Sequence, residues 1–207
     1  MHFNYDLIME LVLDVNKRYT YADYLTWADD KMRELIDGFI RMMSPAPGTL
    51  HQEISGVLIG NLFRFIKKNK GKCKVFPAPF DVRLPKNGEK ADEQIYTVVQ
   101  PDICIVCDLS KLDKRGCIGA PDLVVEIQSA STSKFDLNEK FYLYETHGVR
   151  EYWVVFPYEE CVEVFLLQPD GKYDKGTHYE QGKVPVHIFD GCEIDLTDIF
   201  YTIPPLS

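Results

Sequence analysis

The fold of this chain is decided by residues 119–155, which read GAPDLVVEIQSASTSKFDLNEKFYLYETHGVREYWVV. Residues 123–127 are apolar except for Glu126, and Gly, Pro and Ser residues flank them, so they predict a buried strand. Burying a carboxylate without a partner costs several kcal/mol or forces its neutralisation. Because side chains alternate along a strand, Glu126 shares one face with Asp122 and Gln128. The sequence therefore predicts a polar site on one face of a core strand.

A helix and a further strand are predicted after this strand. Ser133 and Asp136 have the spacing of a capping box, so the helix begins near Ser133, and Gly148 ends it. Lys140 lies on nearly the same stripe as the apolar residues of this helix, where a surface lysine is unexpected. Pairing of Lys140 with Asp136, four residues earlier, is the simple alternative. The apolar stripe consists of Leu137, Phe141 and Tyr144. The strand predicted after the helix spans residues 152–156.

The other elements follow from the same kinds of pattern. Residues 1–16 and 20–30 predict short helices, the second with a capping box of Thr20 and Asp23, and residues 34–43 predict a hairpin with a type I′ Asp-Gly turn. A long helix is predicted at 49–68, with Ile54, Val57, Leu58, Leu62, Phe65 and Ile66 buried. The remaining predictions are strands at 75–84, 98–106 and 162–167, a polar loop at 85–94, a connection at 108–119 and two short strands within 173–201.

Composition describes an ordinary globular domain. The chain has 207 residues, of which 45% are hydrophobic and 27% charged. No run is long enough to span a membrane, and acidic residues interrupt the first apolar stretch, so we expect a cytoplasmic protein without an export signal. The six cysteines follow no disulfide framework, and we expect reduced thiols. Cys104 and Cys107 have zinc-like spacing, but they lie in an apolar strand pattern without a second pair, which disfavours structural zinc.

The net charge of −9 argues mildly against a general nucleic-acid coat, yet positive charge is concentrated in one place. That place is the end of the long helix and the strand after it. The helix dipole alone explains cations at a helix C-terminus, and a track for phosphates explains them equally well. The residues concerned are Arg64, Lys67, Lys68, Lys70, Lys72 and Lys74.

Acidic residues in neighbouring apolar strands indicate metal chemistry. Asp81, Asp102 and Glu126 each interrupt an apolar run, and Lys140 follows on the next helix. Two carboxylates at one end of adjacent strands suit Mg²⁺ or Mn²⁺, which take oxygen ligands and keep several waters. A lysine beside them can hold the attacking water and stabilise charge on phosphorus. The chain has no glycine-rich phosphate loop, no G-x-S-x-G elbow and no zincin histidine pair.

At these residues the chain resembles the "putative restriction endonuclease" family of bacterial proteins, abundant in cyanobacteria, within the PD-(D/E)XK nuclease superfamily. Each matching piece is weak alone, but their order over nearly the whole chain is highly specific. The pieces are YTYADYL, ELIDGFIRMMSPAPGTLHQEI, PAPFDVRL, VVQPDICIVCD, GAPDLVVEIQSAST, DLNEKFYLYETHGVREYWVV and the β tail.

The resemblance implies an α/β fold, a mixed sheet of α+β type, with the restriction-endonuclease-like αβββαβ core. We expect one domain over residues 1–207, made of an N-terminal helix and hairpin (1–48), a nuclease core (49–156) and a β-rich tail (157–207).

It also implies a divalent-metal phosphodiesterase site. Asp102 matches the motif's Asp and Glu126 its second acidic residue, and the Ile127 carbonyl completes the expected metal ligands. Gln128 stands where the superfamily has lysine, and Lys140 is the candidate for the migrated lysine. Glu53 looks like the acidic residue that some members carry on the first helix, while Asp81 and His51 are secondary candidates. A second Pro-Asp pair, at Asp122, is a decoy, because it lies about 13 Å from Glu126 along an extended strand at ~3.3 Å per residue.

Two classes of function follow from these residues. The first is a Mg²⁺- or Mn²⁺-dependent endonuclease cleaving DNA, or another nucleic acid, as a cytoplasmic homodimer whose two sites cut both strands. The second is an inactive relative that kept the fold and serves as a DNA-binding or dimerising module, which the acidic charge and the absent strand lysine favour.

Overall fold

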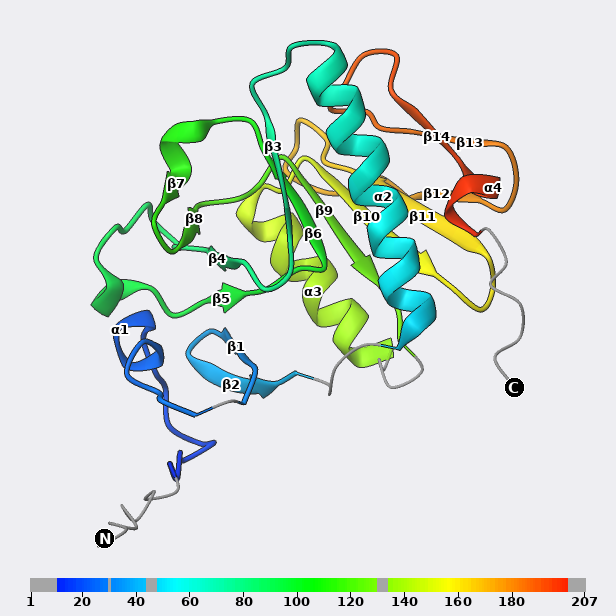
Figure 1. Ribbon diagram of the computed structural model, residues 1–207. Helices are drawn as coiled ribbons and strands as arrows, with labels where there is room; N and C mark the ends of the chain where they lie inside the picture. The colour runs from blue at the N-terminus through cyan, green and yellow to red at the C-terminus, as the bar shows by residue number, and fades with distance from the viewer. Residues whose placement is uncertain (1–10, 30, 44–47, 130–133, 201–207) are drawn as a thin grey trace, which may run out of the picture.

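The computed structural model describes residues 11–29, 31–43, 48–129 and 134–200 (Figure 1). A six-stranded sheet, in the order β12-β11-β10-β9-β6-β3, runs through the centre of the molecule. We call it the large sheet. Its strands are β3 (Lys74–Pro77), β6 (Ile103–Val106), β9 (Leu123–Ile127), β10 (Glu151–Phe156), β11 (Cys161–Leu166) and β12 (Thr177–Tyr179).

Helices α2 (Thr49–Lys68) and α3 (Lys134–His147) cover opposite faces of the large sheet (Figure 1). Leu123, Val125 and Ile127 of β9 pack against α2, whereas Val124 packs with Tyr144 of α3, as the alternation of side chains predicts. Strands β3, β6 and β9 are antiparallel neighbours, and β10 lies parallel to β9. The chain order α2, β3, β6, β9, α3, β10 is the predicted αβββαβ core.

A second sheet, with the order β2-β1-β5-β4-β8-β7, lies beside this core, and we call it the small sheet. The predicted hairpin forms its first two strands. Asp37 and Gly38 have φ values of 53° and 86°, which the predicted type I′ turn requires. The strands are β1 (Arg33–Ile36), β2 (Phe39–Met42), β4 (Asp81–Arg83), β5 (Val98–Val99), β7 (Leu112–Asp113) and β8 (Gly116–Ile118).

The strands predicted at 75–84 and 98–106 are each broken in two, and the prediction of two continuous strands is wrong. Each predicted strand contributes one part to each sheet. β3, from residues 75–84, pairs with β6, from residues 98–106, in the large sheet, and β4 pairs with β5 in the small sheet. Pro77, Pro79 and Pro101 lie at the breaks, and a proline has no N–H to continue a ladder. The two sheets therefore join at this point, and Asp102 lies at the junction.

Other predicted elements need correction at their ends. Thr20 and Asp23 form the predicted capping box, but the helix it starts, α1, is only Tyr21–Tyr24. Residues 11–16 are not helical, and residues 1–10 lie outside the described part. Val57 and Phe65 are half-buried rather than buried. The predicted connection at 108–119 contains η2 (Leu109–Lys111), β7 and β8, and the polar loop contains η1 (Asp92–Gln94). The prediction of two short strands within residues 173–201 is wrong, because the described part of this stretch contains three, β12, β13 (Lys183–Pro185) and β14 (Glu193–Asp195), followed by α4 (Leu196–Ile199).

The expectation of six reduced cysteines is wrong for two of them, because Cys73 and Cys107 form a disulfide. The register of β3 and β6 places Lys74 opposite Val106, so the residues just outside these strands also face each other. The sequence pattern could not show this pairing, since it depends on which strands are neighbours. None of the helices in the described ranges is long and apolar enough to cross a membrane.

Candidate functional site

Asp102 and Glu126 meet at one end of the large sheet. The antiparallel register pairs Ile103 with Val125, so continuing it by one residue places Asp102 opposite Glu126. The Asp102 carboxylate reaches across this gap, where its Oδ2 accepts the N–H of Ile127 at 2.7 Å. The predicted juxtaposition of the two carboxylates is therefore what the fold produces.

Glu126 is buried, and helix α3 supplies its partners. Its Oε1 accepts from Lys140 Nζ at 3.0 Å and from the Tyr144 hydroxyl at 2.6 Å. Lys140 and Tyr144 are four residues apart and so lie on one face of the helix. Burial raises the pKa of Glu126 to about 7; the charge of Lys140 opposes this shift, and the negative charges of Asp102 and Glu34 add to it. An added cation beside Glu126 would therefore stabilise the ionised form of this carboxylate.

Lys140 also pairs with Glu34 of the β1–β2 hairpin, whose Oε1 lies 3.1 Å from Nζ. Burial alone would lower the pKa of Lys140, but the charges of Glu126 and Glu34 outweigh it and raise this pKa above its ordinary value. Lys140 therefore stays a cation and cannot serve as a general base. Arg41, opposite Glu34 in the hairpin, pairs with Glu139 at 2.7 Å and fixes the hairpin against α3.

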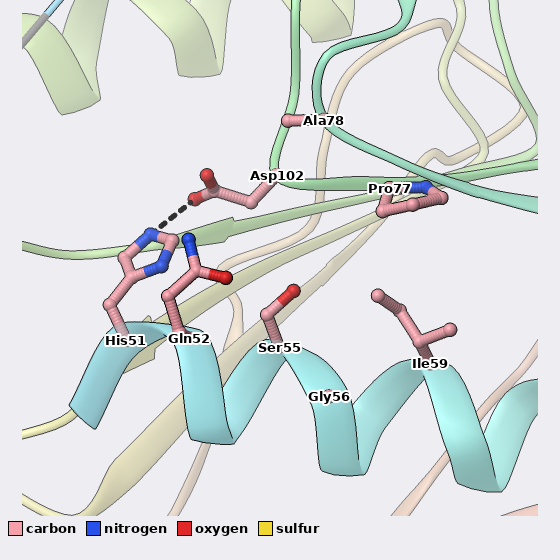
Figure 2. A pocket seen from close by; sticks show the side chains of 8 residues that line it. All are labelled: His51, Gln52, Ser55, Gly56, Ile59, Pro77, Ala78 and Asp102. Atoms are coloured by element: carbon pink, nitrogen blue, oxygen red, sulfur yellow. Dashed lines mark ion pairs between the residues drawn. The ribbon is translucent and has the colours of Figure 1, made fainter. Parts of the chain in front are cut away.

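His51 approaches the same site from the first turn of α2. Its Nε2 lies 3.1 Å from Asp102 Oδ2, as the dashed line in Figure 2 shows. The pKa of His51 is raised above its ordinary value. Burial alone would lower this pKa, but Asp102, the charge of Glu126 and a hydrogen bond to the main chain of Ile127 together outweigh burial. The buried Nδ1 has no hydrogen-bond partner among the described residues.

A hollow of about 170 Å³ opens between α2 and the end of β3, beside this histidine (Figure 2). Asp102 lies on its wall, so a ligand in the hollow has direct access to one of the two carboxylates. Its lining consists of His51, Gln52, Ser55, Gly56, Ile59, Pro77, Ala78 and Asp102.

Three further predicted residues form no described hydrogen bond or ion pair with Asp102 or Glu126. The Gln128 side chain forms no hydrogen bond to a described residue, although its main-chain N–H donates to Val155. Glu53 lies on α2, and its buried Oε2 has no hydrogen-bond partner among the described residues. Asp81 accepts from the Tyr21 hydroxyl and from Gln100 Nε2, both at 2.8 Å, which is a structural role in the small sheet.

Asp122 lies at the opposite end of β9, as expected for the decoy. Its carboxylate accepts the Cys107 N–H at 2.7 Å and pairs with Arg150 at 3.1 Å. The initial prediction of three polar groups converging on one face of this strand is therefore wrong for Asp122, because the length of the strand separates it from Glu126.

Sequence reasoning missed Glu34, Gln100 and Tyr144. The N–H of Gln100 donates to Glu34 Oε1 at 2.8 Å and holds it toward Lys140. Glu34 precedes an apolar pair in a buried strand, the same anomaly that identifies Glu126, and this pattern could have revealed it. Tyr144 lies four residues after Lys140, but its apolar stripe hides the role of its hydroxyl.

The donor set fits a hard divalent cation in part. The described hydrogen bonds and ion pairs occupy Oδ2 of Asp102 and Oε1 of Glu126, so that Oδ1 and Oε2 are free of described partners. Oxygen donors of this kind suit Mg²⁺ or Mn²⁺, which need one or two protein carboxylates and otherwise keep water. Within the described ranges, no three His, Cys, Asp or Glu side chains are grouped to hold a metal.

Known proteins similar to this chain include one family, one curated protein and one solved structure. A family model described as "Uma2: Putative restriction endonuclease" matches residues 21–197. The "Uncharacterized protein slr1290" of Synechocystis sp. is 25% identical over 154 residues, covering 73% of this chain and 75% of that protein. A crystal structure of "a putative nuclease belonging to DUF820 from Anabaena variabilis" has a TM-score of 0.69 at 19% identity, over 88% of this chain and 98% of that one. At this identity the likeness concerns the fold, which is restriction-endonuclease-like.

Proposed function

This chain belongs to the Uma2 family of restriction-endonuclease-like proteins, and on that premise we propose that it is a divalent-metal-dependent endonuclease that hydrolyses DNA phosphodiester bonds. The family supports a nuclease function. One observation carries the finer proposal: the carboxylates of Asp102 and Glu126 lie at the same end of adjacent strands, with the cationic Lys140 in contact with Glu126.

In this proposal Asp102, Glu126 and the Ile127 carbonyl hold one Mg²⁺ or Mn²⁺. When bound, the metal polarises a phosphate oxygen and lowers the pKa of a coordinated water. Lys140 donates hydrogen bonds to the attacking water or a phosphate oxygen and stabilises the negative charge that develops on phosphorus. The Tyr144 hydroxyl and the Asp102 contact with the Ile127 N–H hold the two carboxylates in place.

The experiment compares Glu126→Gln with Asp122→Asn, a change at the other end of the same strand. We expect purified protein to nick supercoiled plasmid DNA with Mn²⁺ or Mg²⁺ and not in EDTA. Glu126→Gln loses at least ~1,000-fold in rate, since a ligand carboxylate supports both the metal and the transition-state charge. Asp122→Asn stays within a few-fold of the wild-type rate per folded molecule. The proposal is refuted if DNA and RNA substrates remain uncleaved with every divalent metal tested.

One observation favours the inactive alternative: Lys140 and His51 already pair with the two carboxylates within the protein. Titration calorimetry with Mn²⁺ separates the two functions. The nuclease proposal expects one Mn²⁺ site that both Asp102→Asn and Glu126→Gln eliminate. An inactive DNA-binding module shows no heat of Mn²⁺ binding that depends on either carboxylate.

A further inference from the structure

A second hollow lies farther along α2, beyond the hollow beside His51. It measures about 480 Å³ and is lined by Gly60, Phe63, Arg64, Lys67 and Lys68. All five of these residues are exposed. The described part of the chain offers no ion pair to any of the three cations, in a protein whose net charge is −9. This end of α2 is therefore a local positive surface on an acidic molecule.

The two hollows lie along one side of the same helix. Gln52, Gly56, Gly60, Phe63 and Lys67 follow one another at spacings of three or four residues, so they form a single exposed stripe. A side-chain carbon built at Gly56 or at Gly60 would have no atom within 4 Å. The glycines thus leave an open path from the site to the cations. We call this stripe, together with Arg64 and Lys68, the α2 track.

Phe63 is the apolar member of the α2 track, and 57% of its surface is exposed. The Lys67 ammonium lies 5.9 Å from the centre of its ring. A cation beside an exposed aromatic face suits a nucleic-acid strand, because the cation contacts a phosphate while the ring stacks on a base or packs on a sugar. The helix dipole explains the cations at this end of α2, but it does not explain an exposed phenylalanine among them.

We propose that the α2 track binds the phosphate backbone of the DNA that enters the Asp102–Glu126 site, an inference that rests on the proposed nuclease function. Charge complementarity identifies the occupant, since three unpaired cations repel a second copy of the same surface and attract a polyanion. Glycines at the centre of the track allow the backbone of a ligand to approach the helix closely.

The length of the α2 track determines how much duplex must extend from the cleaved bond to reach the cations. Arg64 to Lys68 lie 13 to 17 residues beyond His51, or about 20–25 Å along a helix that rises ~1.5 Å per residue. At ~3.4 Å per base pair, the cations contact phosphates about six or seven base pairs from the cleaved bond. A duplex that is shorter than this on that side of the site does not reach them.

Fluorescence anisotropy in EDTA measures binding without cleavage, using a labelled duplex of about 24 base pairs between about 50 and 200 mM salt. The test protein is Arg64→Gln/Lys67→Gln/Lys68→Gln. Its control is Lys90→Gln/Lys114→Gln/Lys175→Gln, which removes the same charge from exposed lysines elsewhere. We expect the α2 variant to lose at least ~10-fold in affinity and about two to three units of salt slope, and the control to stay within about two-fold.

A second variant, Gly60→Gln, separates a loss of DNA binding from a loss of folding. Glutamine is a better helix former than glycine, so this variant should melt at a higher temperature than wild type while its side chain blocks the track and weakens DNA binding about five-fold. Higher stability with weaker binding supports the proposal. Unchanged affinity and salt slope in both α2 variants overturn it.

Two further measurements distinguish this inference from its alternatives. If wild-type protein sediments as a dimer and Gly60→Gln as a monomer, the track is a subunit interface and the inference is wrong. If Glu126→Gln abolishes cleavage but the α2 variants bind and cut normally, the inference fails and the proposed function stands. If no cleavage is found but DNA binding depends on the α2 cations, the proposed function fails and the α2 track stands as a DNA-binding surface.

Discussion

Two buried glutamates on neighbouring strands, Glu126 on β9 and Glu151 on β10, are held in different ways. The oxygens of Glu151 accept the indole N–H of Trp153 at 2.7 Å and the main-chain N–H groups of His187 at 3.0 Å and Ile188 at 2.8 Å. Glu126 accepts from a charged lysine and a tyrosine hydroxyl, both through the same oxygen. Glu151 is thus saturated on both oxygens, and Glu126 is not.

Their positions in the large sheet differ as well. Glu151 pairs with Leu123 at the beginning of β9, on the face that α2 covers, whereas Glu126 lies near the end of β9 on the face toward α3. Donors from the main chain make Glu151 a tie between β10 and the loop before β14. A cationic side chain as partner and an oxygen without a described partner make Glu126 able to take a ligand. The partners of a buried carboxylate, and not its burial, separate a structural role from a functional one.

The largest effect that this comparison predicts beyond Glu126 itself comes from Lys140→Met. Removing the cation takes away a donor to the reacting phosphate and raises the pKa of Glu126 further, so we expect cleavage to fall about 100- to 1,000-fold. Single-turnover cleavage at saturating Mn²⁺ measures the loss. Lys111→Met is the control, because Lys111 donates to the Ala120 carbonyl away from the site and should leave the rate within about two-fold. Equal losses in both variants would deny Lys140 a special role.

Glu151→Gln should produce the opposite pattern, with a loss of stability and no loss of cleavage per folded molecule. The amide presents an NH₂ group to the N–H of Ile188, so a buried donor loses its acceptor at a cost of about 2 kcal/mol. At ~2–4 °C per kcal/mol for a chain of this size, Tm falls by about 4–8 °C. Thermal melting and the cleavage rate of the folded protein check both halves. A slow but fully stable Glu151→Gln would erase the distinction between the two glutamates.

The core of the fold was predictable because its elements depend on local patterns. Helix α2, helix α3 with its Gly148 end, the β1–β2 hairpin and the β9–β10 strands follow from periodicity and turn chemistry. The breaks after Pro77 and before Asp102 were not predictable, since a long apolar run with a proline reads the same whether it stays in one sheet or changes sheets. The Cys73–Cys107 pairing was hidden for the same reason.

The site was predictable where a charge interrupts an apolar run, which holds for Asp102, Glu126 and Lys140. The predicted pairing of Lys140 with Asp136 cannot be compared directly, because the Asp136 side chain and Ser133 lie outside the described part. Lys140 contacts Glu126 and Glu34. Glu34 comes from a hairpin remote in sequence, and only the packing of the small sheet against α3 brings it to the site.

Glu34→Gln tests how far this support from the hairpin matters. Glu34 raises the pKa of Lys140 and fixes its Nζ, so its neutralisation should slow cleavage about 10-fold without preventing metal binding. Glu139→Gln is the matched control, because it breaks the neighbouring ion pair between hairpin and helix but leaves Lys140 untouched. An equal, small change in the cleavage rate of both variants would mean that the hairpin only packs against α3. A lower Mn²⁺ affinity in Glu34→Gln would instead make Glu34 part of the metal site.

The smallest effect concerns the pH dependence of stability without metal. Burial raises the pKa of Glu126 from 4.5 to about 7, so the folded protein holds this proton more tightly than the unfolded chain does. Its contribution to stability is complete below about pH 4.5 and is lost as pH rises through about 7. Glu126→Gln has no such titration, and its free energy of unfolding should therefore increase relative to wild type between about pH 5 and pH 8. Urea unfolding in EDTA at several pH values measures this difference, and added Mg²⁺ should shrink it at the upper end, because the metal stabilises the ionised carboxylate of the wild type. A difference that stays constant with pH would mean that Glu126 is ionised throughout this range, and that its partners satisfy it as fully as the main chain satisfies Glu151.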